Sequence, residues 1–143
     1  MILHAGLLAL RLAGDWRGAL IEGASGSGKS DLALRALDAG WSLVADDRTL
    51  VWSCGGRLYG RAPDVLAGLV EARGLGVLPA PGRAYAEIGL IVRCIGAGPV
   101  ERLPDGETQA VLGVDLPLVR LAALEASAPA KLSRALTHLG VRH

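Results

Sequence analysis

The sequence predicts an α/β fold in which a mixed sheet with few helices carries a phosphate-binding loop, as in P-loop nucleotide-binding domains. First, residues 23–30 fit the pattern G-x-x-x-x-G-K-[ST] and stand between an apolar stretch and a helical pattern. Second, another apolar stretch follows the helical pattern at the spacing of a βαβ unit. Third, short strand-like runs separated by turns fill most of the chain beyond residue 48.

The segment ahead of the loop predicts two strands. Residues 3–12 form an apolar, strand-like run, and Gly14 and Asp15 make a turn into a second strand at residues 18–22. This second strand ends directly before the loop, which is where a phosphate loop must begin.

The segment after the loop predicts a short helix and a third strand. Residues 30–39 carry apolar side chains at helical spacing, and Gly40 stands at the C′ position that ends a helix. Residues 41–45 are an apolar strand that runs into Asp46 and Asp47. Strand, loop, helix and strand within about 30 residues is typical of a βαβ unit, so the two strands are expected to be parallel neighbours.

The rest of the chain predicts hairpins, short strands and a final helix. Gly55 and Gly56 form a tight turn, a short helical piece begins at residue 63, and another turn lies at residues 104–106. Residues 74–82 hold three glycines and two prolines, which predicts a loop that can move. The final helix covers residues 129–139. The predicted strands are residues 49–53, 57–61, 69–72, 86–95, 108–112 and 116–122.

Length and composition narrow the function classes. A chain of 143 residues has room for one domain, residues 1–143, with a core that needs no disulfide or metal. The net charge is +1 and the arginines are scattered, so nucleic acid is not expected as a partner. No apolar run approaches the roughly 18 residues that cross a bilayer, so we expect a cytoplasmic protein without membrane contact.

Cysteine and histidine usage gives no metal pattern. Cys54 and Cys94 lie far apart, and with three histidines they make no zinc spacing. We expect both thiols to be buried, small apolar groups in a reducing compartment.

The glycine-rich loop supplies the candidate nucleotide site. Its glycines let successive backbone N–H groups face one point, and the following helix adds about half a positive charge there. Lys29, one of only two lysines in the chain, would reach the phosphates of ATP, and the Ser30 hydroxyl would bind Mg²⁺. A chance glycine-rich turn is the alternative in a chain with 20 glycines. The loop residues are Gly23, Ala24, Ser25, Gly26, Ser27, Gly28, Lys29 and Ser30.

Asp46 and Asp47 close the strand that follows the loop helix, where a carboxylate would lie beside the Mg²⁺ site. Adjacent residues on a strand point to opposite faces, so the two aspartates are expected to have different tasks. If Asp46 faces the phosphates, Asp47 can hold Arg48 or the next turn, or approach the metal from the side. The alternative is a solvated Asp-Asp-Arg turn.

Glu71 and Arg73 form a second candidate pair. Mg²⁺ keeps several waters and takes one or two protein ligands, so Ser30 and one carboxylate such as Glu71 would suffice. Arg73 could stabilise charge on the transferring phosphoryl group. Taken alone, this Glu-x-Arg sequence is also typical of exposed strands, and His4 alone is typical of a packed or surface histidine.

Together these segments resemble the C-terminal kinase domain of the bifunctional HPr kinase/phosphorylases. The resemblance runs in order and spacing from residue 4 to about residue 80. It implies a fold similar to the nucleotide domain of phosphoenolpyruvate carboxykinase. It also implies transfer of phosphate from ATP to a serine of HPr, the phosphocarrier of the sugar phosphotransferase system. The matching segments are residues 23–31, 32–34, 43–48 and 71–78.

The resemblance also implies roles for the candidate residues. Lys29 would bind the phosphates, Ser30 and Glu71 would bind Mg²⁺, and Asp46 would accept the proton of the substrate serine. His4 matches a histidine that lies close to that aspartate in the family. Members of the family form hexamers, so a homo-oligomer is expected.

Two departures from the family pattern are informative. The N-terminal domain of the long members is not expected here, because His4 stands almost at the start of the sequence. The family's Pro-Val-Arg-Pro-Gly-Arg segment, associated with phosphorolysis, finds only a partial match at residues 116–121, where Arg120 is its one arginine. Kinase activity is therefore predicted more firmly than the reverse reaction.

Two other functions remain open at this point. The chain could bind ATP and signal to a partner without transfer, or it could phosphorylate a small molecule under a closing loop at residues 74–82. A positioned base at Asp46 separates transfer from sensing. A GTPase switch is disfavoured because the sequence holds no Asn-Lys-x-Asp segment.

Overall fold

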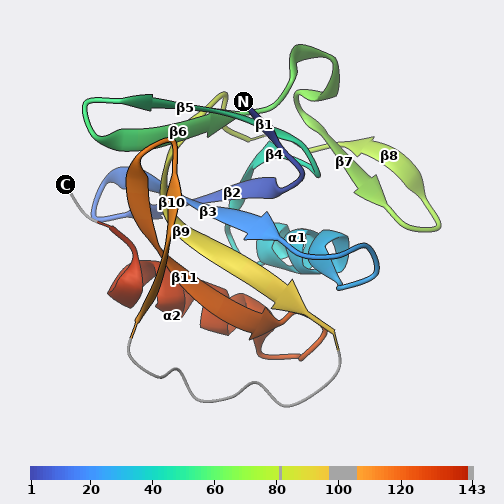
Figure 1. Ribbon diagram of the computed structural model, residues 1–143. Helices are drawn as coiled ribbons and strands as arrows, with labels where there is room; N and C mark the ends of the chain where they lie inside the picture. The colour runs from blue at the N-terminus through green and yellow to red at the C-terminus, as the bar shows by residue number, and fades with distance from the viewer. Residues whose placement is uncertain (81, 97–105, 142–143) are drawn as a thin grey trace.

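A computed structural model describes residues 1–80, 82–96 and 106–141 and shows a mixed sheet with two α-helices (Figure 1). The predicted α/β class is thereby confirmed. Residues 104 and 105 of the predicted turn lie outside the described residues. The elements are β1 (Ile2–Leu3), β2 (Gly6–Leu12), β3 (Asp15–Glu22), α1 (Lys29–Asp38), β4 (Ser42–Ala45), β5 (Thr49–Cys54), β6 (Arg57–Arg61), the 3-10 turn η1 (Asp64–Leu66), β7 (Leu69–Ala72), β8 (Gly76–Pro79), β9 (Ala86–Ile95), β10 (Glu107–Val111), β11 (Val114–Ala122) and α2 (Ala128–Leu139).

The main sheet runs in the order β1-β5-β6-β9-β3-β2-β4, and β11 pairs with β9 and β10. Strand β3 is parallel to β9 and antiparallel to β2. The expectation that β3 and β4 are neighbours is therefore wrong. Both edges of β3 are occupied by β2 and β9, so β4 pairs with β2, the next free edge.

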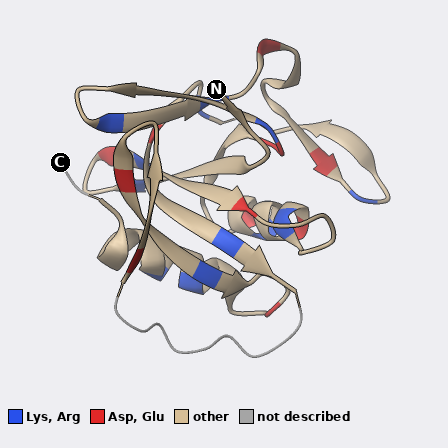
Figure 2. Cartoon of the chain, viewed as in Figure 1, with Lys and Arg blue, Asp and Glu red and all other residues tan. Residues whose placement is uncertain are grey.

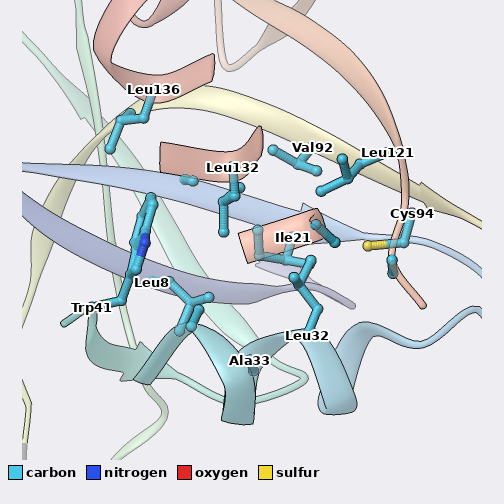
Figure 3. Close-up of a cluster of buried hydrophobic side chains, with 14 of the residues drawn as sticks. Leu8, Ile21, Leu32, Ala33, Trp41, Val92, Cys94, Leu121, Leu132 and Leu136 are labelled. Carbon is cyan, nitrogen blue, oxygen red and sulfur yellow. The ribbon is translucent and has the colours of Figure 1, made fainter. Parts of the chain in front are cut away.

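Both helices pack on one side of the sheet around a core of alternating strand residues and one face of each helix (Figure 3). Leu32 of α1 and Leu132 of α2 are fully buried there, against Leu8 and Ile21 of the central strands. A second cluster lies where the β5–β6 and β10–β11 hairpins cover other residues of β2, β3 and β9. These two cores fix the ends of β3 and β4 relative to the start of α1.

Two predicted elements differ in detail from the structure. The predicted strand at residues 3–12 is interrupted at His4 and Ala5, because β1 pairs with β5 whereas β2 pairs with β3 and β4. The predicted loop at residues 74–82 contains strand β8, which pairs with β7 in a separate two-stranded sheet. Its mobility stays a prediction. In Figure 1 this β7–β8 hairpin extends away from the main sheet.

Neither described helix has the length and apolar character that crossing a membrane requires. Figure 2 shows acidic and basic residues interspersed along the elements, without a continuous basic stripe on the view shown.

Gly82 allows the chain to approach the outer edge of β4. It forms an isolated parallel bridge with Leu43, and the Arg83 N–H donates to the Leu43 carbonyl at 2.9 Å. A Cβ at Gly82 would overlap that carbonyl oxygen, which is backbone and cannot rotate away.

We expect Gly82→Ala to lower the free energy of unfolding by about 1–3 kcal/mol, because the added methyl group forces the two segments apart. Thermal or urea unfolding measures the effect. Gly96→Ala is the matched control, since nothing lies within 4 Å of a Cβ at that position. Equal losses of stability in the two variants would contradict the close approach.

Candidate active site

The glycine-rich loop connects β3 to α1 and leaves the start of the helix open. The Ser27 N–H donates to the Ala24 carbonyl at 3.0 Å, and Gly28 precedes the helix with a φ of 93°. A side chain at Gly28 would meet Leu124, so both the positive φ and the packing require glycine. No side chain caps the helix start, so its first N–H groups are available to an anion.

A narrow pocket lies between the start of α1 and the end of β4. It brings together four of the predicted site residues, two from the loop and two from the strand end. Its lining combines non-polar residues with the polar side chains of these four residues. The lining residues are Gly6, Leu8, Ile21, Lys29, Ser30, Ala33, Ala45, Asp46 and Asp47.

Asp46 is the half-buried carboxylate of this pocket. Its Oδ2 accepts a hydrogen bond from the Glu71 backbone N–H at 2.8 Å. Burial raises the pKa of the Asp46 carboxyl, and the carboxylates of Asp47 and Glu71 raise it further. The hydrogen bond and the charge of Lys29 act in the opposite direction without cancelling the rise in this pKa. A carboxyl held in this way is suited to accept a proton.

Asp47 occupies a strained turn rather than the opposite face of the strand. The Arg48 N–H donates to the Asp46 carbonyl at 2.7 Å, and Asp47 between them has a φ of 65°. This closes a γ-turn, a conformation that is rare for a residue with a side chain. The expectation that the two aspartates face opposite sides is therefore wrong, because β4 ends at Ala45 and strand alternation stops there.

The turn brings the Asp47 carboxylate to the loop lysine. Asp47 Oδ1 lies 3.9 Å from Lys29 Nζ, and 18% of the Lys29 side chain is exposed against 64% for Asp47. An ion pair at this distance, with one partner in solvent, is weak. Lys29 is therefore able to exchange Asp47 for a phosphate oxygen.

Glu71 and Arg73 lie on the β7–β8 hairpin, and they differ in their contacts with the pocket. Glu71 is tied to the pocket through its backbone N–H, and its carboxylate is close enough to raise the pKa of Asp46. Its side chain is exposed and does not line the pocket. Arg73 is exposed in the hairpin turn, and among the described residues its guanidinium has no hydrogen bond or ion pair.

His4 lies beside this region without lining the pocket. It is exposed and directly follows β1, in which Leu3 pairs with Thr49 of β5. Antiparallel register therefore places His4 at the same end as Arg48, next to the turn that holds Asp47. The closeness of His4 to Asp46 that the family resemblance implies stays a prediction.

The oxygen donors of the pocket fit Mg²⁺. Within the described part of the chain, no three His, Cys, Asp or Glu side chains cluster as a closed metal site. Mg²⁺ does not need one, because it retains waters and uses one or two carboxylates beside substrate phosphates. The Ser30 hydroxyl and the two aspartates line one pocket and supply such donors. In the loop, Ser27 Oγ is buried without a hydrogen-bond partner among the described residues.

The partial match of residues 116–121 to the family's Pro-Val-Arg-Pro-Gly-Arg segment stays a prediction. Arg120, in the partial match at residues 116–121, pairs with Glu107 of β10 instead of any pocket residue. A Pro-Gly-Arg tripeptide stands at residues 81–83 of the printed sequence, directly ahead of β9. Arg83 binds the backbone of Leu43, three residues before Asp46.

The two cysteines differ, contrary to the expectation that both are buried. Cys54 is exposed at the end of β5, whereas Cys94 is buried behind the loop. A Cβ on Gly23 would lie 2.8 Å from the Cys94 carbonyl oxygen, so this glycine lets the loop pass close to β9. Burial raises the pKa of the Cys94 thiol to about 11.

We expect iodoacetamide at neutral pH to alkylate Cys54 of the folded chain and to leave Cys94 unmodified. The reactive species is the thiolate, which burial disfavours at Cys94 and which solvent can reach at Cys54. Peptide mass spectrometry measures both sites, and the urea-unfolded chain, in which both should react, is the control. Equal labelling in the folded chain would contradict the placement of Cys94.

Comparison with known proteins finds similar sequences in one family. The sequence model of the HPr serine kinase C-terminal domain matches residues 4–132. The HPr kinase/phosphorylase of Ralstonia nicotianae is 38% identical over 115 residues, which cover 73% of this chain and 36% of that protein. The HPr kinase/phosphorylase of Clostridium tetani is 40% identical over 79 residues, which cover 55% of this chain and 26% of that protein. The chain thus matches about a quarter to a third of the length of these relatives.

A solved structure shares the fold. The Hpr(Ser) kinase/phosphatase from Coxiella burnetii superimposes with a TM-score of 0.79 over 96% of this chain and 88% of that chain, at 23% identity. The arrangement of the sheet and helices is thus that of a known fold.

Proposed function

The chain belongs to the HPr serine kinase C-terminal domain family, and we propose that it is an Mg²⁺- and ATP-dependent kinase that phosphorylates a serine of an HPr-type phosphocarrier. One observation carries the proposal beyond family membership. The phosphate-loop residues Lys29 and Ser30 share a pocket with Asp46, a half-buried carboxylate with a raised pKa. Binding of a nucleotide needs only the loop, whereas transfer to a hydroxyl also needs such a base.

In the proposed reaction, each residue has one task. The open N–H groups of α1 and Lys29 hold the phosphates of ATP. The Asp46 carboxylate accepts the proton of the serine hydroxyl as that oxygen attacks the γ-phosphorus and ADP leaves. The Glu71 N–H keeps the Asp46 carboxyl oriented. Arg73, exposed on the neighbouring hairpin, is proposed to approach the transferring group when substrates bind.

The residues below would hold Mg²⁺, which would supply positive charge against the negative charge of the phosphates. Ser30 and Glu71 are its proposed ligands, and Asp47 can approach it from the side of the γ-turn. His4 is proposed to act near Asp46 from the adjoining strand end. The proposal covers the kinase reaction and does not extend to phosphorolysis, the removal of the phosphoryl group by inorganic phosphate.

We also propose that the chain assembles as a homo-oligomer, a hexamer by resemblance to the family, and acts in the cytoplasm. Exposed apolar side chains are consistent with assembly, since Val65 is 84%, Leu75 76% and Val77 62% exposed. Light scattering of the purified chain measures the mass directly.

ATP turnover with and without purified HPr separates the proposed function from the two alternatives. If the chain is the proposed kinase, it consumes ATP in the presence of Mg²⁺ only when HPr is added. The amount of ATP consumed then equals the amount of phosphoserine formed. A small-molecule kinase would be indifferent to HPr and would turn over with an extract of metabolites. A sensing module would bind ATP with neither acceptor supporting turnover.

The acid limb of the pH profile should report Asp46. A base must be ionised, so kcat/KM should fall about tenfold per pH unit below the pKa of Asp46. Because that pKa is raised, the fall should begin above the ordinary value of 3.8. Asp47→Asn removes one charge that raises this pKa, so its acid limb should move to lower pH. An unmoved limb would show that another group limits the rate at low pH.

A further inference from the structure

A second hollow lies on the outer side of β4, separate from the phosphate-loop pocket. Its volume is about 440 Å3, which is in the range of small-molecule sites. Leu43 and Val44 of β4 form part of its lining together with Ala62 and Ala67, and Arg61 and Arg83 supply positive charge. It shares no residue with the pocket that holds Lys29 and Asp46.

Arg83 is held in place with its hydrogen-bond donors free. Its guanidinium carbon lies 4.6 Å from the centre of the Trp16 ring, and its backbone N–H is fixed to the Leu43 carbonyl. Stacking on an aromatic ring orients a guanidinium without using its N–H groups. Among the described residues, none forms a hydrogen bond or ion pair with the Arg83 guanidinium. A planar group with five oriented donors is suited to bind an oxyanion.

Arg61 can contribute a second guanidinium. Its Nη1 lies 2.8 Å from Asp64 Oδ1, but 92% of the Asp64 side chain is exposed. An ion pair in solvent of this kind contributes little, so Arg61 can exchange Asp64 for a ligand at small cost. Among the residues that the structure describes, Asp64 is the one carboxylate that lines the hollow beside two arginines, so the balance of charge favours an anion.

We propose that this hollow binds a small organic oxyanion, with its carboxylate or phosphate group on Arg83 and Arg61 and its apolar part against the alanine, leucine and valine side chains. The arrangement of a largely apolar lining with a few converging polar groups is typical of small-molecule sites. The hollow is close to the proposed catalytic residues along the chain. Its lining residue Val44 stands two residues before Asp46, and its lining residue Gly68 stands three residues before Glu71.

Three probes that share a phenyl ring test the chemistry: benzoate, phenyl phosphate, and benzamide, which is the neutral match of benzoate in shape. Nuclear magnetic resonance of the indole N–H of Trp16 follows binding to the ATP-free chain, so the test does not depend on kinase activity. We expect saturable shifts with benzoate or phenyl phosphate, and at least tenfold weaker binding of benzamide. Benzoate alone would identify a carboxylate ligand, and phenyl phosphate alone a phosphate monoester.

Matched variants locate the binding. Arg83→Gln should weaken the binding of the oxyanion probe at least tenfold. Arg61→Gln should also weaken the binding of this probe. Lys29→Ala, in the phosphate loop, should leave this signal unchanged, and the melting temperature of each variant checks its fold. Equal binding of benzamide, no binding of any probe, or loss of binding with Lys29→Ala instead of the arginine variants would overturn the proposal.

Discussion

Lys29→Ala is expected to reduce phosphoryl transfer by at least about 10²–10³-fold, the loss typical of removing one preorganised group that stabilises transition-state charge. The side chain lies in the pocket with the start of α1, and only 18% of it is exposed. Its charge is therefore less screened by solvent than that of a surface lysine. Alanine also removes the positive charge that would attract the phosphates of bound ATP before the reaction, so ATP binding should weaken too.

Lys131→Ala is the matched control, because Lys131 is the other lysine of the chain and pairs with Glu125 at an exposed site near the start of α2. Isothermal titration with ATP and Mg²⁺ gives binding, and a coupled assay gives turnover. Unchanged turnover in Lys29→Ala would refute the assignment of the phosphate loop.

Asp46→Asn is expected to retain ATP binding and to lose transfer by about 10²–10⁴-fold, the range contributed by a general base. Asparagine has nearly the same shape, and its carbonyl oxygen can still accept the Glu71 N–H. The replacement removes the negative charge of the carboxylate and with it the ability to take a proton. Asp38→Asn, at an exposed position near the end of α1, is the control that should leave both properties unchanged.

The stability of the same variant provides a second test. A raised pKa means that the folded state disfavours ionised Asp46. The contribution of Asp46 to the free energy of unfolding is therefore most favourable at low pH and is lost as the pH rises through the pKa of the folded state. At neutral pH, Asp46→Asn should therefore melt no lower than the native chain.

The binding of ATP by Asp46→Asn tests the role of Asp46 as a base. If the variant lost ATP binding, Asp46 would be a metal ligand or a structural residue.

The local part of the site could be predicted from the sequence. A glycine-rich loop between a strand and a helix depends on neighbouring residues, so residues 23–30 and the helix after them were located to within one residue. Asp46 was placed at a strand end for the same reason. The separation of β3 from β4 could not be predicted, because it depends on which distant strands occupy the edges of β3.

The orientation of the aspartates depends on one backbone angle. Strand alternation is a sound rule inside a strand, but Asp46 and Asp47 lie beyond the end of β4, and a positive φ at Asp47 is not encoded by its residue type. The contact between Asp46 and the Glu71 N–H likewise spans 25 residues. Such features appear only when the sheet and the β7–β8 hairpin are assembled.

The most direct test of the proposed kinase is transfer from γ-labelled ATP with Mg²⁺ to purified HPr, with the labelled residue mapped and the native chain compared with Asp46→Asn. We expect label on a serine of HPr with the native chain and its loss with the variant, although both bind ATP. Absence of label with a native chain that binds ATP, or equal labelling by the two chains, would contradict it.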